Sequence, residues 1–205
     1  MSTLQRTLLG SGEPVVDPDA PVERIDLDDE SWIDISRDWL LGADTLLDAL
    51  VDDVDWRQGR RPMFDRVVDD PRLSRWYAVG NALPHPALET IRRALEAQLD
   101  VPLRTIGLNY YRDGNDSVAW HADRELRDLT DTRIAIVTLG ARRPFLVRPT
   151  GGGASRDVKP GSGDLLVMSG ACQMRWQHCV PKIKRAGPRI SCSLRWTNTT
   201  KNEPA

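Results

Sequence analysis

The stretch Gly187-Pro188-Arg189-Ile190-Ser191-Cys192-Ser193-Leu194-Arg195-Trp196 alternates strictly between polar and apolar side chains. Because successive residues of a β-strand point to opposite faces, the two arginines and two serines share one face, and the apolar side chains share the other. The pattern therefore predicts a strand that packs one face against a core and presents a polar face on its other side.

Short β-rich segments separated by turn residues continue this pattern through the second half of the chain. They cover 104–111, 118–123, 133–139, 144–147, 164–168, 175–180 and 190–196. Several strands without helical intervals are typical of an antiparallel double-sheet jelly roll. Upstream, apolar stripes predict one helix capped by Asp44 and running to about Trp56, and a second that opens at Pro86. We therefore expect an α+β, mainly β fold: a double-stranded β-helix braced by N-terminal helices.

The chain has 205 residues, enough for one sizeable core. Residues 1–42 are rich in Asp, Pro and Gly without a clear period, which predicts an irregular N-terminal arm before a single domain over 43–197, and a polar tail over 198–205. No apolar stretch is long enough to span a bilayer, and the first residues lack the apolar core of a signal peptide. Three cysteines without metal-site spacing indicate reduced thiols. These features predict a cytoplasmic protein with no membrane contact.

The tripeptide His121-Ala122-Asp123 is the first candidate for chemistry. In an extended strand, residues two apart point to the same face, so the imidazole and the carboxylate can reach one metal ion. His178 would complete a set of two histidines and one carboxylate. Such a set leaves coordination positions open and is typical of Fe(II) oxygenases. A lone His-x-Asp is common by chance, so this assignment depends on its context.

The polar face of the closing strand supplies that context. Arg189 and Arg195 flank Ser191 and Ser193, and guanidinium groups pair with carboxylates through two parallel hydrogen bonds. An ordinary surface strand would simply have these side chains solvated. A metal with open positions beside an arginine anchor for carboxylates, however, indicates 2-oxoglutarate.

Four segments together resemble the AlkB family of Fe(II)- and 2-oxoglutarate-dependent nucleic-acid dealkylases. They are Asn109-Tyr110-Tyr111-Arg112-Asp113-Gly114, Trp120 to Glu125, Gln177 to Lys182, and Pro188-Arg189 to Arg195, and they keep the family's order and spacing over about half of the chain. More weakly, Arg61 to Phe64 and Pro71 to Leu73 look like the family's substrate lid.

The resemblance implies a role for each matched residue. His121, Asp123 and His178 would bind Fe(II), and Asn109, Tyr111, Ser191 and the two arginines would hold 2-oxoglutarate, with Arg189 essential for catalysis. Glu125 would lie over the target base. The family usually has Asn where this chain has Ser191, and the shorter side chain either weakens co-substrate binding or leaves room for a water molecule.

The charge distribution bears on the partner. Residues 1–100 carry 11 Lys and Arg against 21 Asp and Glu, a net charge of −10, whereas residues 101–205 carry 17 against 9, a net charge of +8. The half with the metal motif is therefore the basic half. Its basic residues fall on expected loops and strand ends, where they can meet phosphates: Arg142, Arg143, Arg148, Arg156, Lys159, Lys182, Lys184 and Arg185. Each alone can be merely solvated, but together they favour a polyanion.

The aromatic pair Trp76-Tyr77, with Met63 and Phe64, has two readings of equal weight. These side chains either belong to the core or line a pocket that stacks on a base swung out of the duplex.

Together, these features predict a monomeric enzyme that oxidatively dealkylates N-alkylated bases in DNA or RNA. It would use Fe(II), 2-oxoglutarate and O2, and would release aldehyde, succinate and CO2. One alternative is a 2-oxoglutarate-dependent hydroxylase of a protein side chain or small metabolite, which the triad and arginines do not exclude. Another is a jelly-roll binding module without turnover, which would be expected to have lost a ligand or an arginine anchor. Glu125, the Asn109-x-Tyr111 motif and the basic second half favour a nucleic acid.

Overall fold

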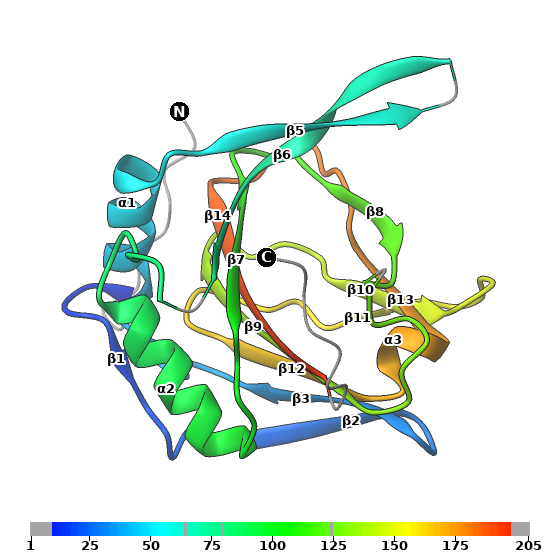
Figure 1. The fold of residues 1–205 in the computed structure, drawn as a ribbon, viewed down its shortest axis with the longest axis horizontal. Helices are drawn as coiled ribbons and strands as arrows, with labels where there is room; N and C mark the ends of the chain where they lie inside the picture. The colour runs from blue at the N-terminus through cyan, green and yellow to red at the C-terminus, as the bar shows by residue number, and fades with distance from the viewer. Residues whose placement is uncertain (1–9, 64, 79, 124, 198–205) are drawn as a thin grey trace.

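A large antiparallel sheet of eight strands dominates the computed structural model, which describes residues 10–63, 65–78, 80–123 and 125–197 (Figure 1). Its strands, in spatial order, are β2 (Val22–Asp28), β3 (Ser31–Ser36), β12 (Leu165–Gly170), β9 (Thr132–Gly140), β14 (Arg189–Thr197), β7 (Thr105–Tyr111), β6 (Arg66–Ala78) and β5 (Arg57–Met63).

A second sheet of four strands closes the roll. Its order is β11 (Arg156–Asp157), β10 (Leu146–Pro149), β13 (Trp176–Val180) and β8 (Val118–His121), and the short helix α3 (Cys172–Arg175) leads from β12 into β13. One apolar core combines side chains of both sheets, among them Ile134, Ile136 and Met168 of the large sheet and Val147 and Val180 of the small one. The predicted jelly roll is therefore confirmed.

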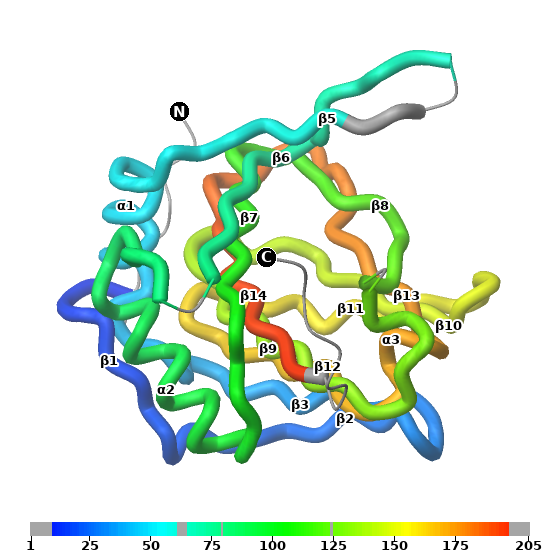
Figure 2. Tube along the Cα trace, in the orientation of Figure 1, coloured from blue at the N-terminus to red at the C-terminus, as the bar shows by residue number. Residues whose placement is uncertain are grey.

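Two helices cover the outer face of the large sheet. α1 (Ala43–Asp53) and α2 (Ala87–Leu99) bury their apolar stripes in a second core, with the outward-facing apolar side chains of β14, β7 and β9 (Figures 1 and 2). The predicted bracing by helices is confirmed. The predicted cap is wrong in one detail, because Gly42 occupies the N-cap, while Asp44 is buried in the first turn and accepts a hydrogen bond from Ser162 Oγ at 2.6 Å. No helix among the described residues is long and apolar enough to cross a membrane.

The strand β14 lies between β7 and β9 and has the two faces that its alternation predicts. Ile190, Cys192 and Leu194 belong to the core under the helices. Arg189, Ser191, Ser193 and Arg195 therefore face the interior of the roll.

The prediction of an irregular arm over residues 1–42 is wrong for its described part. The hairpin of β2 and β3 joins the large sheet, where β3 pairs with β12 over six residues and buries Ile33 and Ile35 in the roll. Val15–Val16 (β1) also pairs with Leu40–Leu41 (β4). The composition misled the prediction because β2 is an edge strand with mostly exposed, charged side chains. Residues 1–9 and the predicted tail 198–205 lie outside the described residues.

The long hairpin of β5 and β6 was not predicted as strands. It extends beyond the body of the roll, and only the later part of β6 pairs with β7 (Figure 1). Both faces of its distal part are exposed to solvent, so its sequence lacks the polar and apolar alternation of a packed strand.

Candidate metal centre and co-substrate site

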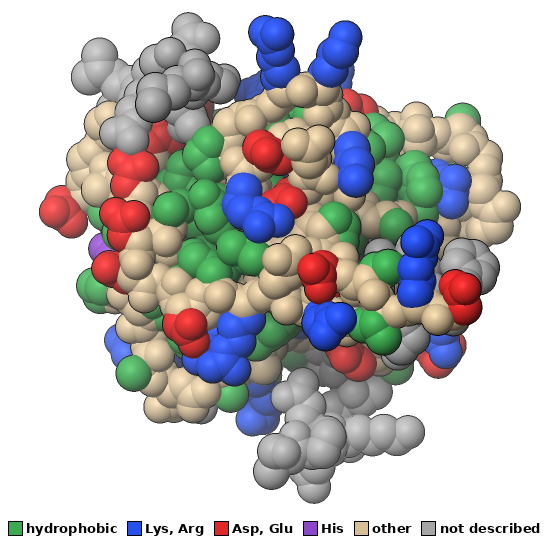
Figure 3. Space-filling model, turned by 90° about the horizontal axis from the view of Figure 1, so that it is seen from above, with side chains coloured by type: hydrophobic (Ala, Val, Ile, Leu, Met, Phe, Trp, Pro, Cys, Tyr) green, Lys and Arg blue, Asp and Glu red, His purple; other side chains and the backbone are tan. Residues whose placement is uncertain are grey.

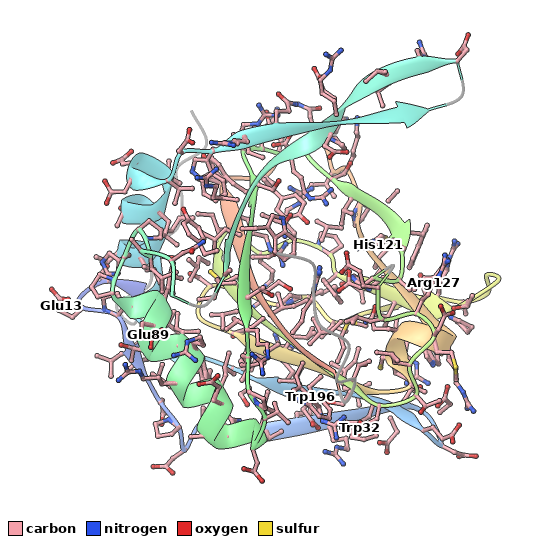
Figure 4. All side chains as sticks on the ribbon, in the orientation of Figure 1. Glu13, Trp32, Glu89, His121, Arg127 and Trp196 are labelled. Carbon is pink, nitrogen blue, oxygen red and sulfur yellow. The ribbon has the colours of Figure 1, made fainter. Side chains whose placement is uncertain are left out.

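The structure brings the three predicted metal ligands together. His121 and His178 face each other across the β8–β13 pair, with ring centroids 4.2 Å apart, and one ligand atom from each of His121, Asp123 and His178 lies within 4.8 Å of the others. Figure 4 shows His121 at the β8 side of the roll. Two imidazoles and one carboxylate fit Fe(II), and such a set leaves positions open for other ligands.

Asp123 reaches this position by a different route from the predicted one. The strand β8 ends at His121, so Asp123 lies in the following turn rather than on the same strand face. Its backbone N–H donates a hydrogen bond of 2.8 Å to the side chain of Gln173, which is fully buried in α3. The link between α3 and this turn therefore holds the carboxylate beside the histidines.

The carboxylate of Asp123 divides its two oxygens between different partners. Oδ1 lies 3.9 Å from His121 Nε2, and Oδ2 lies 2.9 Å from Arg195 Nε. One oxygen is therefore available to a metal ion while the other is held by a guanidinium.

Both histidines are prepared to bind a metal as neutral imidazoles. Burial lowers the pKa of His178 well below its ordinary value, and the charges of His121 and Arg195 act in the same direction. Burial also lowers the pKa of His121, and the positive charge of Arg72 acts in the same direction. His121 Nδ1 lies 2.8 Å from the carbonyl oxygen of Ala119. In the tautomer that carries its proton on Nδ1, this N–H donates a hydrogen bond to the carbonyl, and the lone pair of Nε2 is left for a metal ion.

Arg189 is the strongest sign of an anion site in the roll. Its side chain is fully buried and makes one hydrogen bond, from Nη2 to Thr138 Oγ1 at 3.3 Å, while Nε and Nη1 have no partner among the described residues. Burial lowers the pKa of Arg189 to about 10. A buried guanidinium without a carboxylate is costly to maintain, because the charge has lost its hydration without compensation. A carboxylate of 2-oxoglutarate is the complement that these free N–H groups fit.

Further polar side chains surround Arg189 on the same face of the sheet. Tyr111 is buried beside it, with the Arg189 guanidinium 5.4 Å from the ring centre. Ser191 is buried in register with Asn109 on one side and Thr138 on the other. Thr138 was not predicted as a site residue, although its hydroxyl stands out within the apolar run of β9.

Arg195 contacts both the metal ligand Asp123 and the exposed residues Glu125 and Trp76, which we call the mouth of the site. Besides Asp123, it contacts Glu125, whose Oε2 accepts a hydrogen bond of 3.5 Å from Nη1, and its guanidinium lies 4.7 Å from the ring centre of Trp76. Glu125 lies in a turn with 77% of its side chain exposed, so the predicted strand does not extend to it. The carboxylate of Glu125 and the indole of Trp76 therefore both contact Arg195, which in turn contacts the metal ligand Asp123.

A glycine makes room for this indole. Trp76 pairs in register with Gly107 of β7, and a Cβ atom at Gly107 would stand 2.5 Å from the Trp76 ring. The ring lies against the bare backbone and stays 47% exposed. Trp76 thus belongs to the site side of the sheet.

Tyr77 lies on the opposite face because adjacent strand residues alternate. It packs against the core under the helices and lines a cavity of about 520 Å³ beside α2, which also includes Leu83 and Glu89. Figure 4 shows Glu89 on α2, well away from His121. The pocket reading is therefore wrong for Tyr77. Phe64 and the side chain of Met63 lie outside the described residues.

The basic residues predicted to meet phosphates differ in their exposure: Arg142, Arg156 and Lys159 are exposed, and Arg148 is half-buried. Arg143 is buried and donates to the carbonyl oxygens of Asp113, Asp116 and Pro181, so its role is structural. Lys182, Lys184 and Arg185 are exposed in the loop after β13, the strand that carries His178.

The family assignment follows from comparison with known proteins. The model of the "2OG-Fe(II) oxygenase superfamily" matches residues 44–201, which contain the triad and both arginines. The chain belongs to this superfamily. Fe(II), 2-oxoglutarate and O2 are therefore its implied cofactors, and the buried free donors of Arg189 and the His-Asp-His set fit them.

Two curated relatives narrow the resemblance to AlkB proteins, as predicted. The alpha-ketoglutarate-dependent dioxygenase alkB homolog 3 of Mus musculus is 33% identical over 174 residues, covering 75% of this chain and 61% of that protein. The DNA oxidative demethylase ALKBH2 of Homo sapiens is 30% identical over 125 residues, covering 57% of this chain and 48% of that protein. The chain thus spans less than two thirds of these relatives' length.

One solved structure supports the fold of this oxygenase. The prolyl hydroxylase of Trichoplax adhaerens, in complex with a peptide of the hypoxia inducible factor, has a TM-score of 0.62 at 12% identity and covers 81% of this chain and 83% of its own. Because this identity is low, the likeness concerns the fold alone and carries no information on the substrate.

Proposed function

We propose that this oxygenase removes N-alkyl groups from bases of DNA or RNA, releasing aldehyde, succinate and CO2. The observation that carries the proposal is the junction at Arg195, which places an exposed carboxylate, Glu125, and a half-exposed indole, Trp76, beside the metal ligands. A planar base needs such an aromatic face to stack on and such a carboxylate to accept its hydrogen bonds. The names of the curated relatives, a dioxygenase and a DNA demethylase, support the same reading.

The residues of the roll would divide the chemistry among them. His121, Asp123 and His178 would hold Fe(II), which with O2 and 2-oxoglutarate supplies the oxidising power to hydroxylate a carbon bonded to the base nitrogen. The hydroxylated group would then leave as an aldehyde. The protein's own contribution is placement and the exclusion of water, since the cofactors carry the difficult chemistry.

The co-substrate would lie along the polar face of β14. The free N–H groups of Arg189 would pair with its far carboxylate, while Arg195 would assist the carboxylate nearer the metal. Asn109, Tyr111 and Ser191 would complete the site. Ser191 would leave space beside Asn109 that a longer side chain would fill.

The substrate would enter from the side of the hairpin and the exposed basic loop. Figure 3 views the molecule from above, on the face toward the β5–β6 hairpin, and shows Lys and Arg side chains spread around a hydrophobic area. Together with the loop of Lys182, Lys184 and Arg185, this surface would contact the phosphate backbone. The stacked base would lie on Trp76, with its polar edge toward Glu125.

Replacing Glu125 by Ala tests the substrate assignment. A base whose polar edge faces Glu125 would lose a charged acceptor, so demethylation of a methylated oligonucleotide should fall by about tenfold or more. The affinity for 2-oxoglutarate should not change, because Glu125 is not in the predicted co-substrate site. Single-turnover kinetics with the oligonucleotide and calorimetric titration of 2-oxoglutarate measure the two effects separately.

A matched variant separates charge from hydrogen bonding. Glu125→Gln keeps an acceptor oxygen but removes the charge, so it should impair repair of a cationic methylated base more than repair of a neutral one. Repair at the wild-type rate by the Ala variant would remove Glu125 from the substrate site and favour a protein or metabolite substrate instead.

A further inference from the structure

Arg72 is a charged side chain at the site; the resemblance places its segment, Pro71 to Leu73, in the substrate lid but gives Arg72 no role of its own. It belongs to β6 and directly precedes Leu73, where the pairing with β7 begins, and it shares the site-facing side of that strand with Trp76. Its Nε donates a hydrogen bond of 2.9 Å to Oδ1 of Asn109 on β7. This is the one hydrogen bond that the described residues give to the Asn109 side chain.

The chemistry of the two groups fixes how the amide of Asn109 faces. A guanidinium has N–H donors and no acceptor, whereas an amide has one acceptor oxygen and two N–H donors on its nitrogen. Turning the amide over would set donors against donors. Arg72 therefore requires Oδ1 on its own side and directs both N–H groups of Nδ2 away from itself.

The surroundings of Asn109 show why that direction matters. Asn109 is in register with Ser191 of β14, in the row between Arg189 and Arg195. In this polar row, an amide that presents N–H groups is a donor for a carboxylate, while an amide that presents oxygen repels it.

We propose that Arg72 is a positioning residue for the co-substrate: by holding Oδ1 of Asn109, it turns the amide N–H groups toward the bound 2-oxoglutarate. This inference rests on the proposed function, in which Asn109 contacts 2-oxoglutarate. It also gives the hairpin strand, which carries Trp76 at the mouth, a direct part in organising the co-substrate site.

The test is a double-mutant cycle on binding rather than on turnover. Arg72→Ala, Asn109→Ala and the double variant would each be loaded with Mn(II) and titrated with 2-oxoglutarate in a calorimeter. Each single change should weaken binding by about tenfold, the usual worth of one hydrogen bond. The double variant should bind no more weakly than Asn109→Ala alone, because Arg72 acts through that side chain.

Arg75→Ala is the matched control. Arg75 belongs to the same strand but points to the other face, where it lies 3.7 Å from Asp55 and near the ring of Tyr77. This variant should bind 2-oxoglutarate as the wild type does, and thermal unfolding of all variants would show whether β6 stays folded.

The outcomes separate this inference from the proposal on which it rests. If Asn109→Ala weakens binding but Arg72→Ala does not, the positioning role is wrong and the co-substrate site stands. If the two losses multiply in the double variant, Arg72 acts independently of Asn109, which also contradicts the positioning role. Unchanged binding in Asn109→Ala would overturn the assignment of Asn109 and this inference together.

Discussion

The Asp123→Ala variant is expected to lose iron-dependent turnover by more than about a hundredfold while keeping its fold. Loss of a partner outside the ligand set typically costs 10- to 100-fold in metal affinity or activity, so loss of a ligand itself should cost more. Asp123 also holds Arg195, and its removal would free that guanidinium beside the metal. Metal content after dialysis and product formation per protein measure the effect, and His121→Ala and His178→Ala should behave alike.

Asp128→Ala is the matched control for this prediction. Asp128 lies in the same turn region with 90% of its side chain exposed. The Asp128→Ala protein should therefore bind metal and turn over substrate as the wild type does. Full metal binding by any one of the three ligand variants would contradict the triad.

Replacing Arg189 should weaken 2-oxoglutarate binding by about 10- to 100-fold. Arg189→Lys keeps a charge but loses the planar pair of donors, and hydrogen bonds to charged groups are worth about 1.5–3 kcal/mol. Arg189→Met loses both and should bind more weakly still. Calorimetric titration of the Mn(II)-loaded proteins measures these affinities.

Replacing Arg189 should not destabilise the protein in the absence of 2-oxoglutarate, although the side chain is fully buried. Without its co-substrate, the wild type keeps a buried cation with two unpaired donors, so Arg189→Met should be as stable as the wild type or more so in the absence of 2-oxoglutarate. At the same concentration, 2-oxoglutarate should raise the melting temperature of the wild type more than that of Arg189→Met. If 2-oxoglutarate does not change the melting temperature of the wild type, Arg189 binds another ligand.

The strands that could be predicted are those in which polar and apolar side chains alternate because one face packs against the core. The alternation of β14 gives its faces correctly, and β7, β12 and β13 begin within a residue of their predicted starts. The β2–β3 hairpin escaped prediction because β3 finds its partner, β12, more than a hundred residues along the chain. The distal hairpin of β5 and β6 packs on little else, so its sequence carries no such pattern.

The site shows a similar division. The triad and the two arginines were predictable because they lie in motifs with a fixed order and spacing. Arg72, Thr138 and Gln173 were not, since each acts on a motif residue across the sheet or from a different element. His121 and Asp123 lie close together as predicted, but not on one strand face, because β8 ends before Asp123.

The proposed function requires that this oxygenase oxidises a carbon of an N-alkyl group on a nucleobase. The most direct measurement is mass spectrometry of oligonucleotides that each carry one N-methylated base, incubated with the protein, Fe(II), 2-oxoglutarate and O2. We expect loss of the methyl group from at least one of them, with formaldehyde and succinate formed in equal amounts. Iron-dependent conversion of 2-oxoglutarate to succinate that leaves every methylated base intact, in both DNA and RNA, would contradict it.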